Sequence, residues 1–275
     1  MCLIAFHFAP GTPTPLVLVG NRDEQYSRAT APLATWTDHP EISGGRDLQA
    51  GGSWLAVHQS GRFAALTNVR DPEIIISPNP PSRGQLVRDA LLVDDLHAWL
   101  QQQVAGAGLA FGGFNLLVGN AQQLWHLGRN RRGMQLATVS PGTHGLSNAS
   151  LNSHWPKLCK VREALRHDVN NGDAASLLLP ASLTNFSDPG QAPDEKLPDT
   201  GVGLELERFL SSAFIVGDDY GTRSTTRLAL STSGAIPSFH IIEQRFGVRG
   251  QALGETRLQI AGIEHASLEP VPRPS

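Results

Sequence analysis

The sequence begins MCLIAFHFAPGTPTPLVLVGNRDE over residues 1–24, and this stretch indicates the fold class. Two short apolar runs, 3–8 and 16–20, flank the turn-forming segment 11–13. Apolar runs of this length, without a polar residue at every second position, are typical of buried strands that are covered on both faces. We therefore predict a hairpin of two buried strands with a further layer of structure on each side.

Four polar residues end the second of these strands: Asn21, Arg22, Asp23 and Glu24. A buried strand that opens abruptly into four polar side chains places them at its mouth, which favours a site there. Glu24 has a simpler interpretation as a solvated group that braces the loop, and Asp23 as a helix N-cap. The tetrapeptide alone therefore predicts a polar site without naming its chemistry.

The rest of the chain continues with strands, a pair of helices in the middle and more strands. Further strands are predicted at 53–58, 62–68, 114–118, 123–127, 135–139, 213–216, 223–231, 239–244 and 256–260. Apolar residues at three- and four-residue steps predict helices over 84–103 and 155–166, with short helices over 173–179 and 204–210. Segments 71–82 and 184–203 are rich in turn residues and are predicted to be irregular.

Buried strands need cover on both faces, and two stacked sheets with helices outside supply it. We predict an α+β fold, a four-layer α/β/β/α sandwich with mostly antiparallel sheets. No internal repeat or clear linker divides the chain, so residues 1–268 are predicted to form one domain. The Pro-rich end, 269–275, is expected to be a disordered tail.

Composition argues against several classes of function. The 275 residues carry a formal charge of −3 and only two Cys, so we expect neither nucleic-acid binding nor a disulfide framework. No pair of His or Cys residues has zinc-ligand spacing, so we expect no metal site. No export signal is recognisable, and no apolar run approaches the ~18 residues of a membrane helix. These features predict a cytoplasmic protein without integral membrane contact.

Cys2 becomes the N-terminal residue if Met1 is removed, and its small side chain favours that removal. A free α-amine has a pKa near ~8 and a thiol near ~8.5, so the amine can take the thiol proton directly or through water. His7 fails as a conventional base because five strand residues of about 3.3 Å each place it ~16 Å away, on the opposite face. The alternative is that Cys2 is a tolerated second residue, while Cys159 is expected to be a core residue.

Four further segments, read together with Cys2, resemble the NRDE family, which includes the eukaryotic transport and Golgi organisation proteins of type two. In chain order they are Asn21–Glu24, Gly51–Asn68, Pro141–Asn148 and Tyr220–Thr225. The resemblance implies the N-terminal-nucleophile (Ntn) hydrolase fold, whose layers are those of the sandwich predicted above. More distantly, the chain is similar to the bile-salt hydrolase and penicillin V acylase group, which cleaves linear amides with an N-terminal Cys.

The resemblance to this enzyme group implies a set of catalytic residues by motif position. They are the nucleophile Cys2, Asp23 as the partner of its α-amine, Asn68 and Asn148 as oxyanion donors, and Arg223 beside the thiolate or an anionic substrate group. Those enzymes also have an Arg three residues before the Asp, where this chain has Gly20 and places Arg22 next to Asp23.

Substrate-binding residues are expected to be Asn21, Arg22 and Trp54, with Gly51 and Gly52 permitting tight backbone geometry. Structural alternatives stand beside these roles. Asn68 and Asn148 suit turns, Arg223 suits an ion pair, and Trp54 suits the core or the wall of a pocket.

Two functions from different classes follow from the resemblance. The first is hydrolysis of a linear C–N amide, or of a thioester, with Cys2 as nucleophile and no cofactor. The second is non-catalytic binding and trafficking of haem or a lipid-like acyl compound, because family members have been linked to haem movement. A scaffold whose motif residues only stabilise loops is a third alternative. In the first two cases the expected partner is a small molecule.

Overall fold

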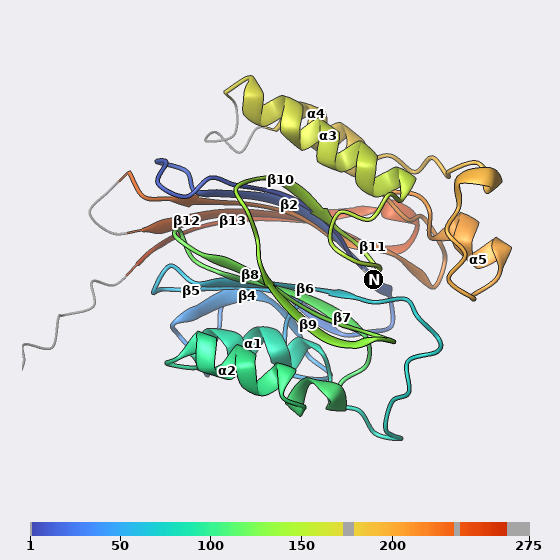
Figure 1. The fold of residues 1–275 in the computed structure, drawn as a ribbon. Helices are drawn as coiled ribbons and strands as arrows, with labels where there is room; N and C mark the ends of the chain where they lie inside the picture. Colours follow the sequence, from blue (N-terminus) through green and yellow to red (C-terminus); the bar gives the residue numbers. More distant parts are fainter. Residues whose placement is uncertain (1, 173–178, 234–236, 263–275) are drawn as a thin grey trace, which may run out of the picture.

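Two antiparallel sheets stack face to face in the computed structural model, which describes residues 2–172, 179–233 and 237–262 (Figure 1). The first sheet has six strands in the order β10 (Gly142–Leu146), β1 (Cys2–Phe8), β2 (Leu16–Gln25), β11 (Tyr220–Ser231), β12 (Ser238–Phe246) and β13 (Ala252–Ala261). The second has seven strands in sequence order: β3 (Thr30–Thr35), β4 (Ile42–Asp47), β5 (Leu55–His58), β6 (Phe63–Asn68), β7 (Phe114–Gly119), β8 (Leu124–Asn130) and β9 (Gly133–Thr138).

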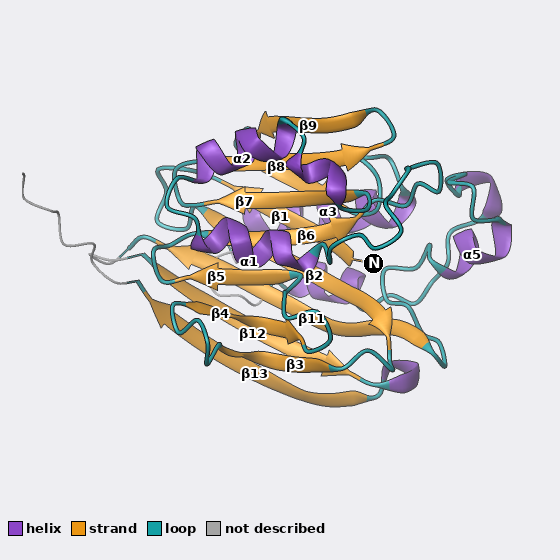
Figure 2. Ribbon diagram, turned by 90° about the horizontal axis from the view of Figure 1, so that it is seen from below, coloured by secondary structure: helices purple, strands orange, loops and turns teal. Residues whose placement is uncertain are grey.

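Helices cover the outer face of each sheet. The seven-stranded sheet carries α1 (Gly84–Leu92) and α2 (Leu96–Val104), as Figure 2 shows from below. The six-stranded sheet carries α3 (Pro156–Asn170) and α4 (Pro180–Phe186), while α5 (Leu204–Phe209) projects at one end. Short 3-10 turns span Ala107–Ala110, Asp194–Lys196 and Val248–Gly250. The predicted four-layer α/β/β/α sandwich is therefore confirmed.

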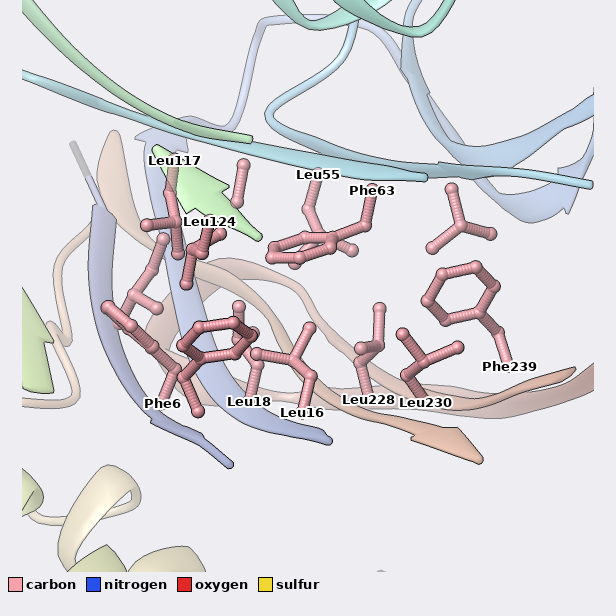
Figure 3. Close-up of a cluster of buried hydrophobic side chains, with 14 of the residues drawn as sticks. Phe6, Leu16, Leu18, Leu55, Phe63, Leu117, Leu124, Leu228, Leu230 and Phe239 are labelled. Carbon is pink, nitrogen blue, oxygen red and sulfur yellow. The ribbon is translucent and has the colours of Figure 1, made fainter. Parts of the chain in front are cut away.

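Alternation along β1 explains why this strand is apolar from Leu3 to Phe6. Ile4 and Phe6 enter the core between the two sheets, while Leu3 and Ala5 enter the core beneath α3 and α4. Figure 3 shows Phe6, Leu16 and Leu18 directed toward Leu55, Phe63 and Leu117 of the other sheet. Each face of this part of the strand is buried, so apolar side chains are favoured at both alternate positions.

Several predicted elements differ from the structure. The predicted helix over 84–103 is two helices, because the Asp95 side chain accepts a 2.9 Å hydrogen bond from the Ala98 N–H and starts α2 there. Residues 213–216 form no strand: the Asn21 side chain holds the Ala213 carbonyl at 2.8 Å in an irregular segment. The helix predicted over 173–179 and the tail at 269–275 lie mostly or wholly outside the described residues.

Strands β3, β4 and β10 lie in segments where no strand was predicted. Pro32 interrupts the pattern of β3, which is tolerated because β3 is an edge strand. Gly44 in β4 is required by packing, since a Cβ there would lie 2.7 Å from the Leu55 carbonyl oxygen. In these segments pairing with neighbouring strands overrides weak local preference.

Candidate active site

Cys2 lines a cavity of about 970 Å³ at the end of the sandwich where β1 begins and α5 projects. Part of its lining comes from the loop at 69–84 and from the α5 segment. The charged lining residues are Arg22, Asp23, Glu24, Arg28, Asp47, Arg70, Asp71 and Arg83. The larger apolar ones are Trp54, Leu66, Val69, Ile74, Ile76, Leu206, Phe209 and Leu210. The cavity therefore combines charged and apolar walls around one thiol.

The Cys2 thiol is buried and sits beside the predicted polar tetrapeptide. Cys2 pairs with Arg22 across the β1–β2 ladder, and the Ser147 hydroxyl lies 3.4 Å from the Cys2 carbonyl oxygen. Burial, helped by the neighbouring Asp23 carboxylate, raises the pKa of the Cys2 thiol to about 11, although the positive chain terminus acts in the opposite direction. The thiol of the chain that retains Met1 is therefore protonated at neutral pH, and a local base is needed to activate it.

Asp23 is fully enclosed where β2 meets β11. Thr222 lies opposite it in the ladder and donates a 2.8 Å hydrogen bond to Asp23 Oδ1. Asp23 lies an even number of residues from Val17 and Val19 along β2, so it is on the same face of the strand, the one that faces α3 and α4. Burial raises the pKa of the Asp23 carboxyl, opposed first by the positive charge of Lys157.

Lys157 is a site residue that the sequence reasoning missed. It stands in the first turn of α3, is only 6% exposed, and donates to the carbonyl oxygens of Leu210 at 2.6 Å and Ser212 at 3.4 Å. Burial lowers its pKa to about 8, while the Asp23 carboxylate acts in the opposite direction. Its spacing of four residues from the buried Val161 was the signal available, because it puts both on one helix face.

The two predicted oxyanion donors have different surroundings. Asn68, at the end of β6, lines the cavity. Asn148 is buried, and its Nδ2 donates a 2.9 Å hydrogen bond to the Asn68 carbonyl oxygen, while the Arg70 N–H donates to the Asn148 carbonyl oxygen at 2.8 Å. The side chain of Asn148 thus braces the backbone that presents Asn68.

Of the three predicted substrate-binding residues, the structure brings Arg22 and Trp54 to the cavity. Asn21 does not line it. It is completely buried under the helix layer, donating to the Phe186 and Ala213 carbonyl oxygens at 2.8 Å each and accepting from Thr225 at 2.7 Å. Strand alternation is the reason, because Asn21 and Arg22 face opposite sides of the sheet.

Arg22 is 6% exposed and lies 3.7 Å from Glu24, while its Nη1 has no hydrogen-bond partner among the described residues. Trp54 packs on Gly20, where an added Cβ would lie 3.1 Å from the Trp54 ring. Trp54 therefore fills the space beside the position where the enzyme group has its Arg. Gly52 meets the predicted need for tight geometry, since a Cβ there would lie 2.3 Å from the Gly84 backbone.

Arg223 does not line the cavity with Cys2. The β2–β11 register shifts between Thr222 and Ser224, so Arg223 is the extra residue of a β-bulge. Its guanidinium donates to the carbonyl oxygens of Gln25 at 2.8 Å and Arg28 at 3.1 Å. In this position it braces the turn after β2 instead of contacting the thiolate.

Among the described residues, no group of three or more His, Cys, Asp or Glu side chains is placed to hold a metal ion. The described cavity lining contains no His, and Cys2 and Tyr220 are its side chains of the types that ligate haem iron. Within the described part of the chain, no helix has the length and apolarity needed to cross a membrane.

Two stacked antiparallel sheets between helix layers, with a Cys at the start of the first strand, define an Ntn-hydrolase-type fold. The structure is similar to a C2A mutant of conjugated bile acid hydrolase from Clostridium perfringens, with a TM-score of 0.53, 7% identity, and coverage of 94% of this chain and 92% of the other. At that identity the likeness shows the fold alone.

The sequence profile of the family "Transport and Golgi organisation 2" matches residues 1–247, and the chain belongs to this family. It is 32% identical over 257 residues to the Transport and Golgi organization protein 2 homolog of Bos taurus, covering 86% of this chain and 91% of that protein. It is 33% identical over 278 residues to Transport and Golgi organization protein 2 of Drosophila melanogaster, covering 89% and 92%. The resemblance seen in the sequence is confirmed.

Proposed function

We propose that the protein is an N-terminal-nucleophile cysteine hydrolase of a linear C–N amide, with Cys2 as nucleophile after removal of Met1. The observation that carries the proposal is the placement of Cys2, Asp23 and Asn68 around one cavity. The partner of such an enzyme is a small amide, and its compartment is the reducing cytoplasm. The reaction needs no cofactor. Both Cys2 and Cys159 are free thiols, which is consistent with that compartment.

The first step forms a bond between Cys2 Sγ and the amide carbonyl carbon. The α-amine of Cys2 takes the thiol proton, and Asp23 holds the resulting ammonium. The carbonyl oxygen becomes an oxyanion, to which the Asn68 side chain donates. Collapse breaks the C–N bond as the ammonium returns its proton to the leaving amine, and water then hydrolyses the thioester to release the acid.

The structural neighbour supports this proposal by its name, because it is a hydrolase of conjugated bile acids on the same fold. The geometry of Asp23 supports it too. Thr222 fixes one carboxylate oxygen, and the buried positive charge of Lys157 partly offsets the burial that raises the pKa of Asp23. An ionised Asp23 is what an α-ammonium partner requires.

A non-catalytic carrier of haem or of a lipid-like acyl compound is the second candidate function. Two observations favour it: the apolar wall of the cavity, and the names of the relatives, which refer to transport. Haem binding would give a saturable shift of the Soret band that Cys2→Ala or Tyr220→Phe alters, since these residues offer the axial ligands. Binding that is non-stoichiometric, or that neither change alters, would exclude the haem version.

The hydrolase proposal is tested with two preparations of the full chain, one retaining Met1 and one beginning at Cys2, as verified by intact mass. Release of amine from a panel of linear N-acyl amides is expected only from the second preparation. Cys2→Ala should abolish it, whereas Cys159→Ala, the matched thiol control, should not. A mature protein that cleaves no amide, or one unaffected by Cys2→Ala, would contradict the proposal.

A further inference from the structure

Arg83 brings a positive charge to the cavity without a carboxylate partner among the described residues. Its Nη1 donates a 3.1 Å hydrogen bond to the Gly113 carbonyl oxygen, which leaves the rest of the guanidinium for a ligand. Burial lowers the pKa of Arg83, and the nearby charges of Glu24 and Cys2 oppose that change. The half-buried Arg83 thus lines the same cavity as the Cys2 thiol.

Two other arginines of the lining, Arg28 and Arg70, already form ion pairs with carboxylates. Arg28 lies 2.5 Å from Asp47, and Arg70 lies 2.6 Å from Glu207. Among the acidic lining residues, Asp71 forms an ion pair with Arg131 at 2.8 Å. Arg83 is therefore the lining arginine that forms no ion pair in the described part of the chain.

Arg22 supplies a second, independent observation. Arg22 is only 6% exposed and lines the same cavity. Its Nη1 lacks a hydrogen-bond partner among the described residues. Glu24 at 3.7 Å is beyond hydrogen-bond distance. A buried guanidinium nitrogen without a partner is costly, and a ligand oxygen would relieve that cost.

Apolar side chains form another part of the lining, and Ile76 lies beside the Arg83 guanidinium at Gly112. Ile74 and Ile76 come from the loop after β6, and Leu206 and Phe209 come from α5. The Arg70–Glu207 ion pair connects these two segments, with both side chains largely buried. A ligand that matches both parts of the lining has an apolar chain and an anionic group.

We propose that the site takes amphipathic amides that carry a carboxylate, with Arg83 and Arg22 binding the carboxylate and the apolar wall binding the acyl chain. The proposal rests on the proposed function for the amide bond, which Cys2 would attack. Arginine suits this role because its planar fork donates two parallel hydrogen bonds to a carboxylate.

Two probes of matched size, N-dodecanoylglycine and N-dodecanoylglycinamide, differ only in the carboxylate. We expect the Cys2→Ala full chain, which cannot turn them over, to bind the glycine compound at least about tenfold more tightly in calorimetry. Arg83→Gln should bring that ratio close to one, with Arg22→Gln reducing it as well. Arg132→Gln removes an exposed positive charge that does not line the cavity and should leave the ratio unchanged.

The readout is a ratio within each variant, so partial loss of stability does not imitate the effect. A ratio near one before any Arg is changed, a ratio that survives Arg83→Gln, or binding of neither probe would overturn the proposal. Hydrolysis is scored separately in the mature wild-type chain. Cleavage of both probes at equal efficiency would support the proposed hydrolase function and contradict the proposed specificity for a carboxylate. Binding that depends on Arg83 but is not followed by cleavage would support the carboxylate specificity and contradict the hydrolase function.

Discussion

Thr222 and Asp23 face each other across the β2–β11 ladder, and the Thr222 hydroxyl donates a 2.8 Å hydrogen bond to Asp23 Oδ1. The same hydroxyl oxygen accepts a 2.9 Å hydrogen bond from the Ile215 N–H. Residues 199 positions apart in the chain are thereby joined in one buried network. This network orients the carboxylate that the proposed mechanism requires.

Replacing Thr222 with Val keeps the shape of the side chain and removes both hydrogen bonds. We expect a loss of about 1–3 kcal/mol in the free energy of unfolding, because the Ile215 N–H and Asp23 are left buried with fewer partners. Urea denaturation measures it. Thr232→Val removes an exposed hydroxyl and should change stability by less than about 0.5 kcal/mol. Equal effects of the two changes would contradict the network.

Lys157 predicts a pH dependence of stability. Its pKa is lowered from 10.5 to about 8 in the folded chain, so the unfolded chain binds more protons between these values. The stability of the wild type relative to Lys157→Met should therefore rise between pH 8 and 10.5, by up to about 3 kcal/mol. Unfolding curves across this range test it, with the exposed Lys160→Met as the control. If the stability difference between the wild type and Lys157→Met did not change between pH 8 and 10.5, Lys157 would not be desolvated.

The sandwich was predictable because its central strands are apolar on both faces, as at Ile4 and Leu3. The edge and glycine-rich strands were not. Gly142–Leu146 has little strand character of its own, and it becomes β10 only because β1 pairs with it. Local preference and tertiary pairing point the same way in the centre of a sheet and diverge at its edges.

The candidate site was partly predictable for a related reason. Motif order identified Cys2, Asp23 and Asn68, which line one cavity. It could not show that a β-bulge turns Arg223 away, or that alternation buries Asn21 beneath the helices. Which face a side chain takes depends on register, and a single slip reverses it.

Asn68 and Asn148 should separate activity from stability. Asn148→Ala removes the donor to the half-buried Asn68 carbonyl oxygen, so it should cost about 1–3 kcal/mol of folding free energy. Asn68→Ala instead removes a cavity side chain at the end of β6, and we expect it to lower kcat by about 10²–10³ with little change in stability. Melting curves and amide-release rates on both variants test this contrast. The reverse pattern would make Asn148 the oxyanion donor and Asn68 a structural residue.

Alkylation of Cys2 by iodoacetamide should report the activation of its thiol. In a Cys159→Ala chain that retains Met1, the reaction rate should rise with a midpoint near pH 11, because burial raises the pKa of Cys2 to about 11. When the chain begins at Cys2, an α-ammonium on the same residue stabilises the thiolate, so the midpoint should fall. Intact mass after timed alkylation at each pH gives both profiles. Asp23→Asn in the mature chain removes a negative charge that raises this pKa and should lower the midpoint again. Coincident midpoints near the ordinary value of 9.0 in all three chains would mean that neither burial nor the terminal amine controls the thiol.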